Sequence, residues 1–175
     1  MLGDFMADAF WFKIDEKIEY TNLPENVLKH CKKQESKLAA AKLIELGVKN
    51  LRYEKNGKPI CDNCYVSISH SGDYIAVCRS DLPIGIDIEC LDKDINWQRL
   101  ADRYFSPDEL DFLSLSPCKE TFLEIWTKKE ALSKISGNGL KDIFKKVSVL
   151  SIVGYTFKTT KTENFILSIC EKVGA

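Results

Sequence analysis

The stretch that decides the fold reads Gly85-Ile86-Asp87-Ile88-Glu89. Its alternation of apolar and acidic residues predicts a β-strand over 84–89, because successive side chains of a strand point to opposite faces. The isoleucines then share one face, and the two carboxylates share the other at a spacing of about 6–7 Å. An ordinary half-exposed strand shows the same alternation, so this pattern alone leaves a structural and a functional interpretation open. Oxygen ligands of this kind favour a hard ion such as Mg²⁺.

A second informative segment is Trp126-Thr127-Lys128-Lys129-Glu130-Ala131-Leu132-Ser133-Lys134, which predicts a helix. Glu130 and Lys134 are four residues apart and therefore lie on one side of it, as they also would in a common surface ion pair. Lys129 falls within the apolar arc, where a lysine must either reach the surface or meet an anion. Three carboxylates beside lysines suit a divalent cation that holds a phosphate, so the two segments together indicate phosphoryl-group chemistry.

The composition predicts a folded chain with a real core, organised as one domain or two small lobes. Of its 175 residues, 45% are hydrophobic and 29% are charged, and the formal net charge is −1. This near-neutral charge argues against nucleic acid or a membrane as a partner. No apolar run approaches the ~20 residues of a membrane span, and the N-terminal residues do not resemble a signal peptide. The seven cysteines are therefore expected as free thiols in the cytoplasm.

The order of expected elements suggests two similar halves. The first half has strands expected at 10–14, 51–54, 65–69 and 74–78, with a helix over 24–47. The second has a strand at 84–89, helices at 106–113 and 119–136, and strands at 147–152, 155–159 and 165–170. We therefore predict an α+β fold with an N-terminal lobe over 1–82 and a C-terminal lobe over 83–175. The C-terminal lobe would carry the metal site, and the active site would lie at the join.

Two further motifs have weaker implications. Ser67–Gly72 is a strand that runs into a turn, and the His70 ring could donate to a phosphate there or be merely structural. Cys61 and Cys64 form a C-x-x-C pair that could bind Zn²⁺ together with His70 and Cys78, although no second close cysteine pair supports it. The sequence contains neither G-x-x-x-x-G-K-[ST] nor G-x-G-x-x-G.

Taken together, these segments resemble the 4'-phosphopantetheinyl transferases, in particular the two-lobed monomeric kind that activates carrier domains of nonribosomal peptide and polyketide synthases. The family pattern is G-[IV]-D-[IV]-E, F-[ST]-x-x-E, W-[ST]-x-K-E-[AS]-x-x-K and G-x-G-L. It is matched in order by residues 85–89, 105–109, 126–134 and 137–140. Upstream, Gly57-Lys58-Pro59 and Ser67–Gly72 are similar to the family's G-K-P and S-x-S-H-S-G. Each motif alone is weak, but the series is specific.

The resemblance implies a fold of two pseudo-twofold-related lobes, each a small antiparallel sheet packed on a long helix. It also implies the Mg²⁺-dependent transfer of the 4'-phosphopantetheine group from coenzyme A to a serine of an apo acyl or peptidyl carrier protein. Adenosine 3',5'-bisphosphate would be released. The protein would act as a monomer, and its basic stretch over 119–146 would help to dock the acidic carrier.

The resemblance also implies roles for individual residues. Mg²⁺ bridging the pyrophosphate of coenzyme A would be held by Asp87, Glu89 and Glu130. Phosphates would be contacted by Lys129 and Lys134. The nucleotide end would be held by His70, Ser69 and Lys58. Asp87, Glu130 and Lys134 would be catalytic, with Glu130, or a metal-bound water that it orients, as the base toward the serine and Lys134 on the leaving side. The role of Glu109 stays open.

Two other functions stay open at this point. A non-catalytic module could bind coenzyme A or a carrier protein, and such binding would survive the loss of Asp87. Another Mg²⁺-dependent phosphate enzyme, such as a nucleotide hydrolase, would form its product without a protein acceptor. A zinc-stabilised interaction domain is a further structural alternative.

Overall fold

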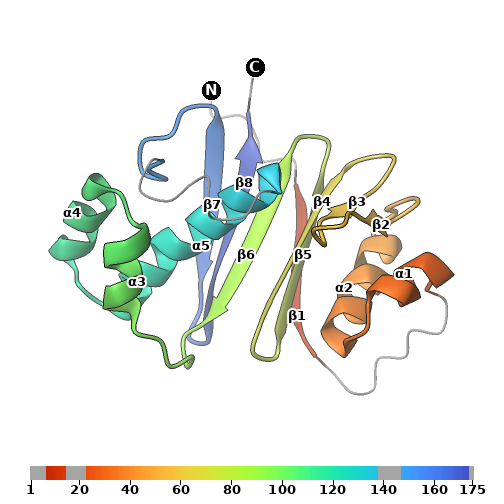
Figure 1. Cartoon of the computed structure of the whole chain (residues 1–175), viewed down its shortest axis with the longest axis horizontal. Helices are drawn as coiled ribbons and strands as arrows, with labels where there is room; N and C mark the ends of the chain where they lie inside the picture. Colours follow the sequence, from red (N-terminus) through yellow and green to blue (C-terminus); the bar gives the residue numbers. More distant parts are fainter. Residues whose placement is uncertain (1–6, 15–22, 138–146, 174–175) are drawn as a thin grey trace.

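The computed structural model of the chain describes residues 7–14, 23–137 and 147–173, and its first half is built on a small antiparallel sheet. The strands of this sheet lie in the order β1-β5-β4, and their bounds are β1 Asp8–Lys13, β4 Tyr65–Ser71 and β5 Tyr74–Ser80. Helices α1 (Glu25–His30) and α2 (Gln34–Glu45) cover one face of it (Figure 1). A short two-stranded ribbon, β2 (Arg52–Tyr53) with β3 (Pro59–Ile60), stands beside β4.

The second half also contains a three-stranded antiparallel sheet and helices. Its antiparallel sheet has the strand order β6-β8-β7, with bounds β6 Ile84–Cys90, β7 Tyr155–Lys161 and β8 Phe165–Lys172. Its helices are α3 (Trp97–Tyr104), α4 (Pro107–Leu115) and α5 (Lys119–Ser136). The α+β class and the antiparallel sheets are thereby confirmed.

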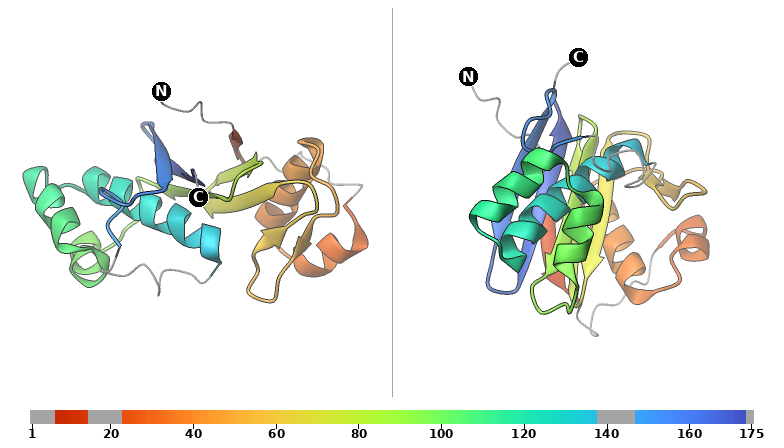
Figure 2. Two further views of the ribbon diagram at one scale, coloured as in Figure 1. Left: turned by 90° about the horizontal axis from the view of Figure 1, so that it is seen from above. Right: turned by 60° about the vertical axis from the view of Figure 1, so that its left-hand side comes forward.

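The two sheets stand between two groups of helices, α1 and α2 at one end of the molecule and α3 to α5 at the other (Figure 2). One hydrophobic cluster joins α1 and α2 to the first sheet, and a second joins α3, α4 and α5 to the second sheet. A third cluster lies between the sheets and includes Ala76 and Cys78 of β5. The isoleucines at 84, 86 and 88 face this third cluster, so the predicted separation of β6 into an apolar and an acidic face is confirmed.

Two sequence predictions differ from the structure, and one helix was missed. The helix predicted over 24–47 is two helices, because the chain becomes extended at Cys31, whose side chain is buried in the first core. The strand predicted over 147–152 is wrong: Val149 N donates to the Glu109 carboxylate at 2.9 Å and Ile152 N bonds back to Ser148 O. Helix α3 was not predicted, although Asn96 caps it by accepting from Arg99 N.

Helix α5 is the longest helix of the described ranges, and its Lys134 reaches Asp87 on the acidic face of β6. It begins and ends at the residues that the sequence predicts, and Gly137 closes it in the left-handed conformation, with φ of 77°. None of the helices in the described ranges is long and apolar enough to cross a membrane.

Candidate functional site

The site is built where α5 crosses β6 at Gly85. A Cβ atom placed on Gly85 would lie 1.9 Å from the carbonyl oxygen of Ala131, so only glycine allows the helix backbone to approach the strand this closely. Ala131 is flanked by Glu130, and Lys134 lies one helical turn from Glu130. The close crossing therefore brings both side chains to the acidic face of β6.

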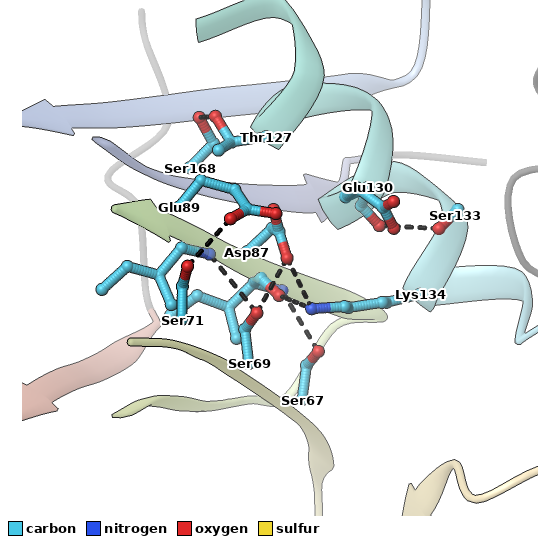
Figure 3. A network of polar contacts seen from close by, with 12 residues as sticks. Ser67, Ser69, Ser71, Asp87, Glu89, Thr127, Glu130, Ser133, Lys134 and Ser168 are labelled. Atoms are coloured by element: carbon cyan, nitrogen blue, oxygen red, sulfur yellow. Dashed lines mark hydrogen bonds and ion pairs between the residues drawn. The ribbon is translucent and has the colours of Figure 1, made fainter. Parts of the chain in front are cut away.

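Asp87 lies at the centre of the group shown in Figure 3. Its side chain is buried, and Oδ1 accepts from Lys134 Nζ at 2.8 Å and from Ser69 Oγ at 2.8 Å. Lys134 Nζ also donates to Ile86 O at 2.8 Å. The second oxygen, Asp87 Oδ2, is buried and has no hydrogen-bond partner among the described residues. A buried carboxylate oxygen without a partner is costly, so it marks a place that a cation would stabilise.

The electrostatics of the neighbouring carboxylates support the same conclusion. Burial raises the pKa of Asp87, the Glu89 carboxylate raises it further, and Lys134 opposes the shift. Burial, followed by the charge of Asp87, raises the pKa of Glu130 to about 7. Glu89 is less buried and is paired with Lys93 Nζ at 3.1 Å. Two carboxylates whose pKa values are raised, those of Asp87 and Glu130, would ionise more readily around a divalent cation.

The donor set fits Mg²⁺, although it does not form a closed cage. Within the described ranges, no three His, Cys, Asp or Glu side chains are grouped so as to hold a metal ion by themselves. Mg²⁺ is usually bound through only one or two carboxylates, with waters and substrate phosphates completing its shell. Oxygen-only side chains with one unpartnered buried oxygen are compatible with that mode of binding.

A cavity opens beside Glu130 and Lys134. Its volume is about 250 Å³, and its lining includes Lys58, Glu130, Lys134 and Gly137. A larger cavity of about 880 Å³ shares Lys58, Pro59 and Val66 with it and is lined by residues of both halves of the chain. Lys58 Nζ donates to Ile135 O at 2.5 Å, which ties the β2–β3 ribbon to the last turn of α5. The structure thus brings Lys58 to the same cavity as Glu130 and Lys134.

His70 and Ser69 point to opposite faces of β4. Ser69 is buried and its hydroxyl donates to Asp87, so the structure brings Ser69 to the carboxylates. The His70 side chain is 54% exposed, and its Nε2 lies 4.0 Å from Glu35 Oε1 at the start of α2. The structure therefore does not bring His70 to Asp87.

Lys129 requires a correction. Its side chain is 1% exposed, and Nζ lies 2.8 Å from Glu109 Oε2 and 2.7 Å from Val147 O. Glu109 also accepts from Ser106 N at 2.9 Å, which completes the capping box of α4. The ammonium is therefore sealed in the core with a carboxylate, and the phosphate contact expected for Lys129 has no access to solvent. Glu109, whose role stayed open, is the partner of Lys129.

Several contacts of the site were not found from the sequence. Ser71 Oγ donates to Glu89 Oε2 at 2.8 Å. Behind the carboxylates, Thr127 Oγ1 lies 2.7 Å from Ser168 Oγ and ties α5 to β8 (Figure 3). The two-residue period of the serines in β4 could have indicated that three hydroxyls share one face.

The cysteines do not gather into a metal site in the described part of the chain. Cys61 Sγ and Cys64 Sγ are 3.4 Å apart as free thiols on the wall of the larger cavity. Cys78 is buried between the sheets, and His70 points to the α2 side of β4. The zinc interpretation therefore has no support from this geometry.

Comparison with known proteins gives consistent matches. A family model described as the 4'-phosphopantetheinyl transferase superfamily matches residues 83–170. The chain is 33% identical over 140 residues to the 4'-phosphopantetheinyl transferase psf-1 of Bacillus pumilus, covering 77% of this chain and 56% of that protein. It is 35% identical over 127 residues to the 4'-phosphopantetheinyl transferase AcpT of Escherichia coli strain K12, covering 67% and 64%. The chain thus spans less than two thirds of the length of both relatives.

Proposed function

This chain belongs to the 4'-phosphopantetheinyl transferase superfamily, and we propose that it transfers the 4'-phosphopantetheine group of coenzyme A to a serine of an apo acyl or peptidyl carrier protein. The observation that carries the proposal is the group formed by Asp87, Glu130 and Lys134. It combines a buried unpartnered carboxylate oxygen, a carboxylate with a pKa of about 7 and a lysine, beside a cavity.

In the proposed site, Asp87, Glu89 and Glu130 hold Mg²⁺, which when bound would neutralise charge on the pyrophosphate of coenzyme A. Oδ1 of Asp87 accepts from Lys134, and Oδ2 has no hydrogen-bond partner in the described part of the chain. One oxygen of Asp87 is thus bound by the protein, and the other would bind the ion.

The proposed reaction forms one bond and breaks one. The carrier serine Oγ bonds to the β-phosphorus of coenzyme A, and the bond from that phosphorus to the bridging oxygen breaks to release adenosine 3',5'-bisphosphate. Glu130 takes the serine proton as the general base. Lys134 places its ammonium where negative charge develops on the leaving side.

The nucleotide end of coenzyme A is assigned to the N-terminal half. Lys58 lines the cavity beside Glu130, and His70 is exposed on β4, so both are accessible to a phosphorylated ligand. We further propose lobes over 1–82 and 83–175 related by a pseudo-twofold axis, with the site at their join. In this proposal the protein is a cytoplasmic monomer that uses neither nucleic acid nor a membrane, and the basic stretch over 119–146 helps to dock the carrier.

The decisive experiment is intact-mass spectrometry of an apo acyl carrier protein incubated with this protein, coenzyme A and Mg²⁺. A mass gain of one phosphopantetheine group, abolished by EDTA, is the expected result. Coenzyme A binding without any mass gain on several carriers would replace the transferase with a non-catalytic binding module. Hydrolysis of coenzyme A or a nucleotide without a carrier would indicate another Mg²⁺-dependent phosphate enzyme.

A further inference from the structure

Strands β4 and β6 are joined by serine hydroxyls. β4 pairs with β5 and β6 pairs with β8, and no backbone hydrogen bond between β4 and β6 occurs in the part of the chain that the structure describes. Instead, Ser67 Oγ accepts from Ile86 N at 3.1 Å, Ser69 Oγ from Ile88 N at 3.4 Å, and Ser71 Oγ from Cys90 N at 3.1 Å. We call Ser67, Ser69 and Ser71 the serine ladder.

The serine ladder satisfies the free edge of β6. An edge strand presents unpaired N–H groups at alternate residues, and buried N–H groups need an acceptor. Serines at every second position of β4 match this period, and Ser67, Ser69 and Ser71 are all buried. Each hydroxyl thus takes the place that a backbone carbonyl has in an ordinary sheet.

A hydroxyl differs from a carbonyl because it also carries a proton that it can donate. Ser69 Oγ donates to Asp87 Oδ1 and Ser71 Oγ donates to Glu89 Oε2, each at 2.8 Å (Figure 3). The rung at Ser67 accepts from Ile86 N, and the preceding residue of β6 is Gly85, which has no side chain to receive a proton. Ser69 and Ser71 therefore each bind both the backbone of β6 and one of its carboxylates, whereas Ser67 binds the backbone alone.

We propose that Ser69 and Ser71 are positioning residues that orient Asp87 and Glu89 for the divalent cation, so that the N-terminal half sets the geometry of a metal site carried by the C-terminal half. The inference rests on the proposed function. It gives Ser69 a role different from the nucleotide contact that the family resemblance implies, because its hydroxyl is already shared between Ile88 N and Asp87.

The orientation follows from which oxygen each serine occupies. Ser69 and Lys134 both bind Asp87 Oδ1, which leaves Oδ2 as the free oxygen. Ser71 binds Glu89 Oε2 at 2.8 Å, the same oxygen that Lys93 approaches at 3.1 Å. Without these donors, each carboxylate could rotate about its terminal torsion, which is broad and roughly two-fold.

The test compares Ser69→Ala and Ser71→Ala with Ser67→Ala, which removes a rung of the same kind that touches no carboxylate. Mn²⁺ binding to each purified full-length variant is measured by electron paramagnetic resonance, with and without coenzyme A. Loss of a group that orients a metal ligand typically weakens metal binding by about 10–100-fold. We expect that loss for Ser69→Ala and Ser71→Ala, and a change below about twofold for Ser67→Ala.

A second readout separates positioning from simple stabilisation. Urea denaturation should show a lower midpoint for all three variants, because each loses a hydrogen bond to a backbone N–H, and a somewhat lower one for Ser69→Ala and Ser71→Ala, which also lose a hydrogen bond to a carboxylate. Ser69→Thr, which keeps the hydroxyl, should recover Mn²⁺ binding. Equal Mn²⁺ affinities in the three alanine variants would overturn the proposal, and so would a failure of Ser69→Thr to recover binding while it remains folded. If Ser69→Ala does not fold, the Mn²⁺ affinity of Ser71→Ala compared with that of Ser67→Ala tests the proposal in the same way.

The outcomes also distinguish this proposal from the proposed function. A wild-type protein that modifies the carrier while Mn²⁺ binding is unchanged by Ser69→Ala and Ser71→Ala leaves the function standing and removes the positioning role. If the wild-type protein modifies no carrier but Ser69→Ala and Ser71→Ala selectively lose Mn²⁺ binding, the positioning role stands and the transferase function does not. A wild-type protein that binds no Mn²⁺ in either condition overturns the proposal outright.

Discussion

Helix α5 presents two lysines to two buried carboxylates, and the pairs differ in what surrounds them. Lys129 meets Glu109 and Lys134 meets Asp87, both with a closest N–O distance of 2.8 Å. The Lys129 and Glu109 side chains are 1% and 0% exposed, whereas Lys134 is 27% exposed and Asp87 is 7% exposed. The lysines are five residues apart on one helix, so the local helix does not account for the difference.

The difference lies in the acceptors. Both Glu109 oxygens are satisfied, Oε1 by Lys129 and Val149 N, and Oε2 by Ser106 N and again by Lys129. Asp87 keeps one oxygen without a partner in the described ranges. A closed pair, whose oxygens are all bonded, stabilises the fold, whereas an open pair, which keeps one unbonded carboxylate oxygen, is suited to bind the proposed ion. Counting the partners of each oxygen therefore separates a structural ion pair from a functional one better than distance does.

Breaking the open pair should have the largest effect, and on activity. Asp87→Asn keeps the shape of the side chain but removes a proposed metal ligand. We expect carrier modification to slow by about 10³-fold or more, roughly 4 kcal/mol of activation free energy, measured by intact-mass time courses. The urea midpoint should not fall, because a buried charge has been removed. Asp92→Asn, at an exposed acid nearby, is the control, and near-normal activity of Asp87→Asn would refute the metal assignment.

Breaking the closed pair should instead affect stability. Lys129→Met leaves Glu109 buried with its ionic partner gone, which typically costs about 3–5 kcal/mol of unfolding free energy. Urea denaturation of Lys129→Met, Glu109→Gln and the double variant gives the coupling between the two side chains. The double variant should be more stable than Lys129→Met alone. A Lys129→Met protein within about 1 kcal/mol of wild type would mean that the pair is not closed.

A smaller effect should appear at Glu130 as a pH dependence of the metal-free protein. Its pKa is raised from 4.5 to about 7, so its favourable contribution is present below about pH 4.5 and is lost as the pH rises through about 7. The unfolding free energy of Glu130→Gln minus that of wild type should therefore be about 2 kcal/mol larger at pH 8 than at pH 5, since a tenfold change in proton affinity is worth about 1.4 kcal/mol. Chemical denaturation at the two pH values in EDTA tests this. An equal difference at both would contradict the burial of this carboxylate.

The smallest effect is expected at a third lysine pair, which extends the comparison to the surface. Lys93 is 52% exposed and lies 3.1 Å from Glu89 Oε2. Exposed pairs of this kind contribute about 0–1 kcal/mol and are screened by salt. Lys93→Ala should change the unfolding free energy by less than about 0.5 kcal/mol, and the change should vanish in 1 M NaCl. A loss comparable to that of Lys129→Met would show that exposure is a poor guide here.

The sequence predicts best where a regular period meets a buried face. The alternation over 84–89 predicted the two faces of β6, and the positions of Glu130 and Lys134 on α5 followed from helical spacing. The same reasoning recognised that Lys129 must snorkel or meet an anion. It could not identify the anion as Glu109, because that contact joins α4 to α5 through tertiary packing.

Other features depend on contacts between distant segments. Residues 147–152 have the composition of a strand, but their backbone binds Glu109 and itself, so tertiary structure overrides local propensity. The serine ladder needs β4 to lie beside β6, an adjacency that no local pattern encodes. Roles transferred by resemblance are open to the same error, because a matching residue can lie where no ligand reaches it, as Lys129 does.

The contact between Gly85 and the Ala131 carbonyl has a consequence for how the chain can change. At Gly85 the main chain of β6 lies directly against the main chain of α5, so at this point the separation of helix and strand is set by atoms common to every residue type. Substitutions elsewhere in the core can alter volume and shape without altering that separation. Gly85 thus fixes the distance between α5 and β6, and that distance can stay the same while other residues of the core change in sequence.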